Sequence, residues 1–200
     1  MGCLQPWAEL LGPAAELSDL SALASCLQPL RIESREALLR FLRDYFSRTL
    51  VQQDLPVICR AHGHACRNEA RELIELDQSI SSERQPFATA SQAAGRAQLN
   101  RLKPMRDQRM IHRYLLAVEE GKAKAWHAVV YGAALALYSI PLRQGLAHYL
   151  QQTLRGFILA ASSRLNLSEA EREALFQQAA PNILESIEQL FPAPFAASVA

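Results

Sequence analysis

The sequence predicts an all-α protein, a single-domain helical bundle of about seven to nine helices. Alanine and leucine, both strong helix formers, dominate its 200 residues. The β-branched residues that strands favour are scarce, and eight glycines are too few for a chain built on tight turns. Half of the residues are hydrophobic and a fifth are charged, which is typical of a globular protein that folds without disulfides or structural metals.

The charge balance excludes a nucleic-acid binder that depends on bulk charge. The formal net charge is +1 and the pI is about 7.7, whereas such domains usually exceed a pI of ~9. No basic residue precedes Arg31, so the start of the chain lacks the basic region of a secretory leader. We therefore expect a cytoplasmic protein with reduced cysteines.

One uncharged stretch, Ala125–Leu142, requires a test for a membrane span. A spanning helix needs ~20 mostly apolar residues. This stretch is shorter than that and contains His127 and Pro141. We expect it to be a buried helix and predict no membrane partner.

Composition divides the chain into three parts. Residues 1–33 are broken by prolines and have no clear period, apart from a short helix expected around Leu17–Leu27. Residues 34–192 form the helical domain. Residues 193–200 form a loose tail.

The first helix of the domain is predicted to begin after Ser34. Serine is a good N-cap, and Leu38 and Leu42 then recur at helical spacing. Asp54 and Pro56 predict a second helix, with the aspartate as its cap and the proline in its first turn.

Caps and apolar spacing predict the remaining helices. Ser82 and Ser168 each begin a capping box, and Pro104 ends the helix that precedes it. Ser91 and Gly95, like Gly132, are expected to allow close packing between helices. The predicted helices span about 56–66, 69–79, 82–102, 126–139, 142–164 and 168–190, with a further helix around Met110, Tyr114, Leu115 and Val118.

Basic residues outnumber acidic ones between residues 96 and 124. Few aromatic residues are interspersed, so a docking surface for an acidic protein explains the stretch at least as well as a nucleic-acid site. We predict no nucleic-acid partner.

Cys59, His62 and Cys66 are the densest group of soft metal ligands, and they share one face of a predicted helix. Thiolate and imidazole suit zinc, copper or nickel. Their spacing matches no standard zinc module, however. The competing interpretation is that the cysteines are small buried apolar residues.

No catalytic motif is recognisable. The sequence has no nucleophile elbow, phosphate loop, dinucleotide fingerprint or zinc-protease motif. His127 is expected to be buried, and His112 and His148 to lie at or near the surface. We therefore predict that the protein is not an enzyme.

Residues from about 37 to 190 resemble the family of urease accessory protein F (UreF). Each motif is weak alone, but their order and spacing are similar to those of the family. The motifs are Phe41-Leu42-Arg43-Asp44-Tyr45, Asp54-Leu55-Pro56-Val57 with Arg60 and His62, Ala90-Ser91-Gln92-Ala93-Ala94-Gly95-Arg96, His127-Ala128-Val129-Val130-Tyr131-Gly132 leading to Ile140-Pro141, and Ala161-Ser162-Ser163-Arg164-Leu165.

The resemblance implies an all-α homodimer without catalysis or a cofactor of its own. Such proteins join the accessory D/H protein and the UreG GTPase and deliver nickel into apo-urease. Arg164, Arg96 and Asp54 occupy family motifs and are the candidate partner-binding residues. Arg164 could equally be a cation favoured at a helix end, and Asp54 a cap.

Three other functions stay open. One is a helical enzyme like haem oxygenase, with His127 or His62 as the haem ligand. Another is a stand-alone metal-binding helical protein. A ligand-binding regulator would need a helix-turn-helix, and residues 1–35 contain no convincing one.

Overall fold

The computed structural model describes residue 27 and residues 30–82, 87–102 and 109–191, and this part of the chain forms helices and no strands. The all-α prediction is confirmed. None of the described helices is long and apolar enough to cross a membrane. The expected helix at 17–27, apart from residue 27, and most of the capping box at Ser82 lie outside the described residues.

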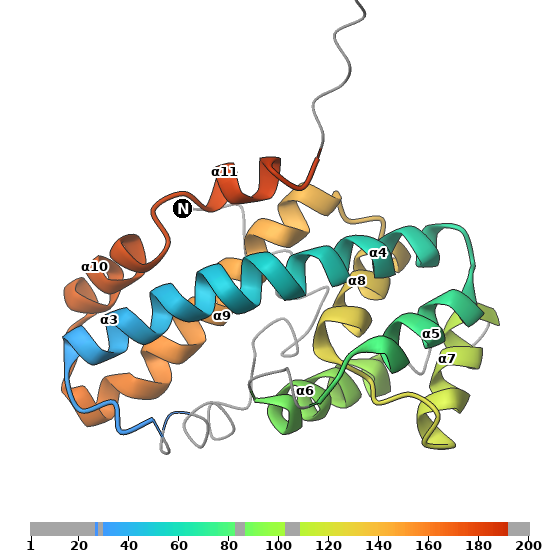
Figure 1. The fold of residues 1–200 in the computed structure, drawn as a ribbon, viewed down its shortest axis with the longest axis horizontal. Coiled ribbons are helices and arrows are strands. Elements are labelled where there is room, and N and C mark those ends of the chain that lie inside the picture. Colours follow the sequence, from blue (N-terminus) through green and yellow to red (C-terminus); the bar gives the residue numbers. More distant parts are fainter. Residues whose placement is uncertain (1–26, 28–29, 83–86, 103–108, 192–200) are drawn as a thin grey trace, which may run out of the picture.

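One continuous helix runs along the molecule through three segments, α3 (Arg35–Asp44), a π-helix (Tyr45–Asp54) and α4 (Leu55–Cys66) (Figure 1). Ser34 caps α3 as predicted, because its Oγ accepts a hydrogen bond from the Ala37 N–H at 3.2 Å.

The predicted cap at Asp54 is wrong. Asp54 has helical backbone angles, and its side chain caps nothing. The helix continues because the π-helix widens the turn before Pro56, where the proline ring would otherwise meet the carbonyl of an α-helical turn. The Leu55 N–H accordingly donates to the Leu50 carbonyl, five residues back.

The other helices lie close to their predicted positions, and Ser168 and Glu171 form the expected capping box. The prediction of one helix over 168–190 is wrong, because Pro181 interrupts it. The observed helices are α5 (Ala70–Ser79), α6 (Ala88–Arg101), α7 (Arg109–Glu119), α8 (His127–Leu137), α9 (Leu142–Leu165), α10 (Glu169–Ala179) and α11 (Ile183–Glu188).

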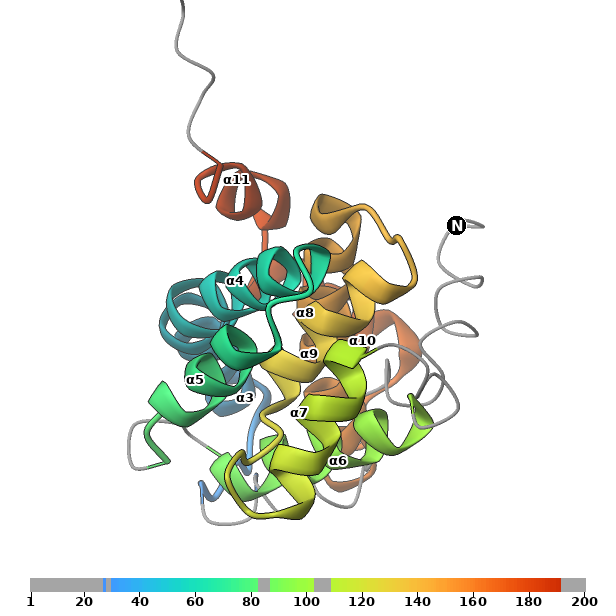
Figure 2. The same cartoon turned by 90° about the vertical axis from the view of Figure 1, so that its right-hand side faces the viewer.

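α8 is the centre of the core. Every residue from His127 to Leu135 is buried, and α8 packs under α4 (Figure 2). A Cβ at Gly132 would lie 2.5 Å from the Ile58 carbonyl oxygen and 2.8 Å from the Ala61 Cβ. Glycine at this position therefore allows the two helices to approach closely, as predicted.

The start of α8 rests on α6. A Cβ at Gly95 would lie 1.9 Å from the Ala125 carbonyl oxygen. One turn away, the Ser91 Oγ accepts a 3.4 Å hydrogen bond from the His127 N–H. The predicted packing role of these two residues is confirmed.

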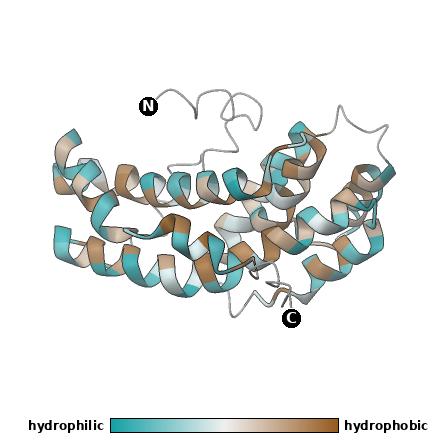
Figure 3. Ribbon diagram, turned by 90° about the horizontal axis from the view of Figure 1, so that it is seen from above, coloured by the Kyte–Doolittle hydropathy of each residue, from teal (hydrophilic) through white to brown (hydrophobic). Residues whose placement is uncertain are grey.

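The remaining helices form two groups at opposite ends of the molecule. α3, α9 and α10 pack together at one end, and α5 and α7 pack together at the other, whereas α6 packs on α8 and α11 on α9 (Figure 1). Hydrophobic and hydrophilic residues alternate along these helices, so each presents a polar face beside its packed one (Figure 3).

Candidate functional site

Asp54 lies inside the protein, although the sequence placed it among the partner-binding candidates. It is 9% exposed, and its Oδ2 accepts a 2.9 Å hydrogen bond from the Tyr149 hydroxyl. Burial raises the pKa of this carboxyl to about 7, against the lowering effect of the Tyr149 hydrogen bond. Asp54 is therefore an internal titratable group and offers no carboxylate to a partner surface.

A cluster of buried aromatic and histidine side chains surrounds this carboxyl. The Tyr149 ring lies 5.0 Å from Tyr131 and 5.4 Å from His127 between centroids. The Tyr131 hydroxyl donates to the Gly145 carbonyl at 3.0 Å and lies 3.2 Å from His148 Nδ1.

His127 is buried, as predicted, but the surface position predicted for His148 is wrong. His148 is 2% exposed, and burial lowers its pKa, which favours the neutral ring. The cluster joins α8 and α9 through the contacts of the Tyr131 hydroxyl with Gly145 and His148.

A second buried carboxylate, Asp77, holds the chain that leads into α8. It accepts hydrogen bonds from the Tyr114 hydroxyl at 2.7 Å, from the Trp126 N–H at 3.0 Å and from the Lys124 N–H. Burial raises the pKa of Tyr114 well above its ordinary value, and the Asp77 charge raises it further. Asp77 thus connects α5, α7 and the start of α8.

Sequence reasoning missed Asp77, although a local signal exists. Asp77 follows Leu73 and Leu76 in the buried stripe of α5. An acidic residue in the apolar stripe of a helix indicates a buried carboxylate with partners elsewhere in the fold.

The three predicted metal ligands do not form a metal centre. Each His62 ring nitrogen lies 3.8 Å from the Cys66 Sγ. Burial raises the pKa of the Cys59 thiol, which disfavours the thiolate that binds metals. Within the described ranges, no group of three or more His, Cys, Asp or Glu side chains is placed to hold a metal ion.

Arg164 and Arg96 are both exposed, on different helices. Arg164 lies in the last turn of α9, and its Nη2 is 3.8 Å from the Glu33 Oε1. This ion pair joins the end of α9 to the segment before α3. Arg96 lies on the outer side of α6. The structure therefore offers Arg164 and Arg96 to partners, but not Asp54.

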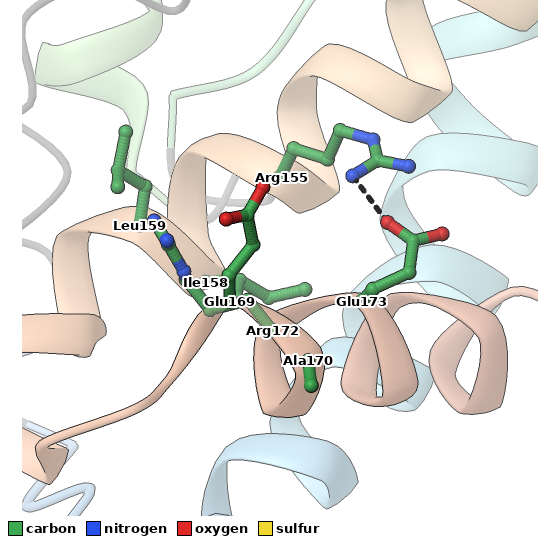
Figure 4. Close-up of a pocket in the computed structure, with 7 residues that line it drawn as sticks. All are labelled: Arg155, Ile158, Leu159, Glu169, Ala170, Arg172 and Glu173. Carbon is green, nitrogen blue, oxygen red and sulfur yellow. Dashed lines mark hydrogen bonds and ion pairs between the residues drawn. The ribbon is translucent and has the colours of Figure 1, made fainter. Parts of the chain in front are cut away.

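A surface groove of about 420 Å³ lies between α9 and α10. Figure 4 shows side chains from both helices reaching into this space, with Arg155 paired to Glu173 at 2.8 Å. Ile158 is buried, whereas Leu159 is 46% exposed. The full lining is Arg155, Ile158, Leu159, Glu169, Ala170, Arg172 and Glu173.

The arrangement around this groove suits contact with another protein. Arg155 also stacks on the Phe176 ring at 4.1 Å, which fixes its position. Arg172 Nε is buried and has no hydrogen-bond partner in the described part of the protein. An exposed leucine beside two arginines is compatible with a protein-docking surface, because arginine is enriched at protein–protein interfaces.

A comparison with protein families identifies the chain. The model of the UreF family matches residues 32–176, well over half of the sequence. The chain belongs to the UreF family of urease accessory proteins. No curated protein matches it. The match begins just before the Ser34 cap and ends within α10, so it includes both buried carboxyls, Arg164 and every residue that lines the α9–α10 groove.

Proposed function

We propose that this UreF-family protein is a non-catalytic scaffold for urease maturation. It joins the accessory D/H protein and the UreG GTPase, and the assembly delivers nickel into apo-urease. The family match over residues 32–176 carries the proposal. Nickel is the cargo of the assembly, so this chain needs no resident cofactor.

The geometry supports a role based on surfaces. The polar side chains of the core serve packing: Asp77 fixes the entry to α8, and Asp54 is bound to Tyr149. Arg164 and the α9–α10 groove lie outside this core and are exposed. We place one partner contact at Arg164 and the adjoining end of α9, and we propose that the protein acts as a cytoplasmic homodimer.

Size-exclusion chromatography with light scattering tests the scaffold. The protein is run alone and then with the D/H protein and UreG from the same organism. We expect a dimer alone and a single co-eluting complex in the mixture. Separate elution of all three folded proteins would contradict the proposal.

Two variants locate the contact on α9. Arg164→Ala should weaken the complex, because it removes an exposed cation from the proposed surface. Arg143→Ala is the matched control, since Arg143 is equally exposed and ion-paired near the other end of the same helix. Equal complex formation by both variants would move the contact away from Arg164.

A further inference from the structure

A second groove, of about 430 Å³, lies between α5 and α7, which pack together at the end of the molecule away from α10 (Figures 1 and 2). α5 supplies one wall, and α7 with the segment after it supplies the other. The lining residues are Ala70, Arg71, Ile74, Glu75, Gln78, Arg113, Leu116, Ala117, Glu120 and Lys122.

The lining has an apolar part that remains accessible. Ala70 and Ala117 are buried, and Ile74 is half-buried. Leu116 is 40% exposed, although it is a large apolar side chain. This part of the groove can cover one apolar side chain of a binding partner.

Two of the three cations in the groove lining are paired with glutamates that also line it. Arg71 pairs with Glu75 at 2.8 Å, and Lys122 pairs with Glu120 at 2.7 Å. Within the described residues, no hydrogen bond or ion pair reaches Arg113. An exposed arginine beside an exposed leucine thus offers charge and apolar contact together.

The surroundings of Arg113 favour an acidic partner. Arg109, one turn earlier on the same side of α7, is also exposed. The α9–α10 groove differs, since its two arginines face two glutamates and the lining charges balance. The lining holds three cations and two glutamates, an excess of one positive charge. That excess suits a single carboxylate better than a nucleic-acid backbone, whose closely spaced phosphates need several cations.

We propose that the α5–α7 groove binds a protein segment that places an apolar side chain beside Leu116 and a carboxylate at Arg113. The identity of the segment's source rests on the proposed function, because we expect it in a urease-maturation partner. The apolar side chain and the carboxylate expected in that segment follow from the lining residues of the groove alone.

A peptide array tests this inference directly. Overlapping peptides that cover the D/H protein, UreG and the urease subunits are probed with the labelled full-length protein and with three variants. Arg113→Glu and Leu116→Ser change the groove, and Leu184→Ser is a matched control at an exposed leucine of α11 that lines neither groove. Arg113 is exposed and has no ion pair with any described residue, so Arg113→Glu should melt close to the wild-type temperature.

We expect the wild type to retain peptides that carry Asp or Glu near a leucine, isoleucine or phenylalanine. Arg113→Glu should weaken these spots by about tenfold or more, and Leu116→Ser should also weaken them. Peptides with the acidic residue changed to lysine should regain binding to Arg113→Glu. Leu184→Ser should bind as the wild type does.

Three results would overturn the inference: no bound peptide, bound peptides without acidic enrichment, or equal binding by Arg113→Glu. The chromatography experiment above separates this failure from failure of the scaffold. If the complex forms but no peptide binds through the α5–α7 groove, only the groove proposal is contradicted. If peptides bind through the groove but no complex forms, only the scaffold proposal is contradicted.

Discussion

The two buried aspartates show that one residue type can have two roles in one fold. Asp77 is fully buried and accepts three hydrogen bonds from two other segments of the chain. Asp54 is nearly as buried but, in the part of the chain that the structure describes, has a single donor, Tyr149. Asp77 therefore stabilises the folded protein by accepting hydrogen bonds that hold its donors in place. Asp54, in contrast, is buried at the lowest cost in free energy when it carries a proton.

The two aspartates support the helices that form the two surface grooves. Asp77 fixes the segment between α7 and α8, and α7 forms one wall of the α5–α7 groove. Asp54 ties the π-helix to α9, and α9 carries Arg164 and forms one wall of the other groove. Each groove is thus supported by one of the two carboxyls.

The largest expected effect is that of Asp77→Ala. The change leaves the Lys124 and Trp126 N–H groups and the Tyr114 hydroxyl without their acceptor. We expect the free energy of unfolding to fall by about 3–5 kcal/mol in urea denaturation. Asp77→Asn, which keeps one acceptor oxygen, should lose less. A loss below about 1 kcal/mol for the alanine variant would show that Asp77 does not hold this junction.

Asp54 should make stability depend on pH in a defined direction. Its pKa is raised from 3.8 to about 7, so the folded state holds the proton more tightly than the unfolded state. The resulting stabilisation is complete below pH 3.8 and is lost as the pH rises through 7.

Asp54→Asn removes this titration and isolates its effect. Between pH 4 and 8, we expect the wild type to lose on the order of 2–4 kcal/mol relative to the variant. Urea denaturation across this pH range measures the difference, and other titrating groups cancel in the comparison. Parallel pH profiles for the two proteins would refute the raised pKa.

A smaller effect is expected for Tyr149→Phe, which removes the one donor to Asp54 found among the described residues. The loss should be about 1 kcal/mol at pH 5, where Asp54 is neutral, and larger at pH 8, where the charged carboxylate is left without a donor. Thr153→Val is the control, because the Thr153 hydroxyl donates to the backbone carbonyl of Tyr149, which does not titrate. Its loss should be the same at both pH values, and identical pH behaviour of the two variants would contradict the assignment.

The sequence predicts the helices well where caps and apolar spacing agree. Ser34 and Ser168 mark true helix starts, because capping depends on neighbours within three residues. The cap predicted at Asp54 fails because Asp-Leu-Pro fits a helix start and also a helix that continues through a π-segment. Pro181 indicates the break between α10 and α11, but a prediction from apolar spacing alone continues one helix across it.

The candidate site is less predictable because its contacts join distant parts of the chain. Asp54 and Tyr149 are 95 residues apart, and Asp77 and Trp126 are 49 apart. No local pattern specifies such pairs, although a carboxyl within an apolar stripe indicates that some partner exists. Likewise, spacing placed Cys59, His62 and Cys66 on one face, but it could not show that burial disfavours the Cys59 thiolate.

The most direct test of the scaffold role is reconstituted urease activation. Apo-urease, the D/H protein, UreG, GTP and nickel are combined with and without this protein, and urease activity is followed over time. We expect urease activity to develop at an enhanced rate only when this protein is present. Asp77→Ala should fail to support activation where its loss of stability prevents assembly of the complex. Equal activation with and without the folded wild-type protein would contradict its role in nickel delivery.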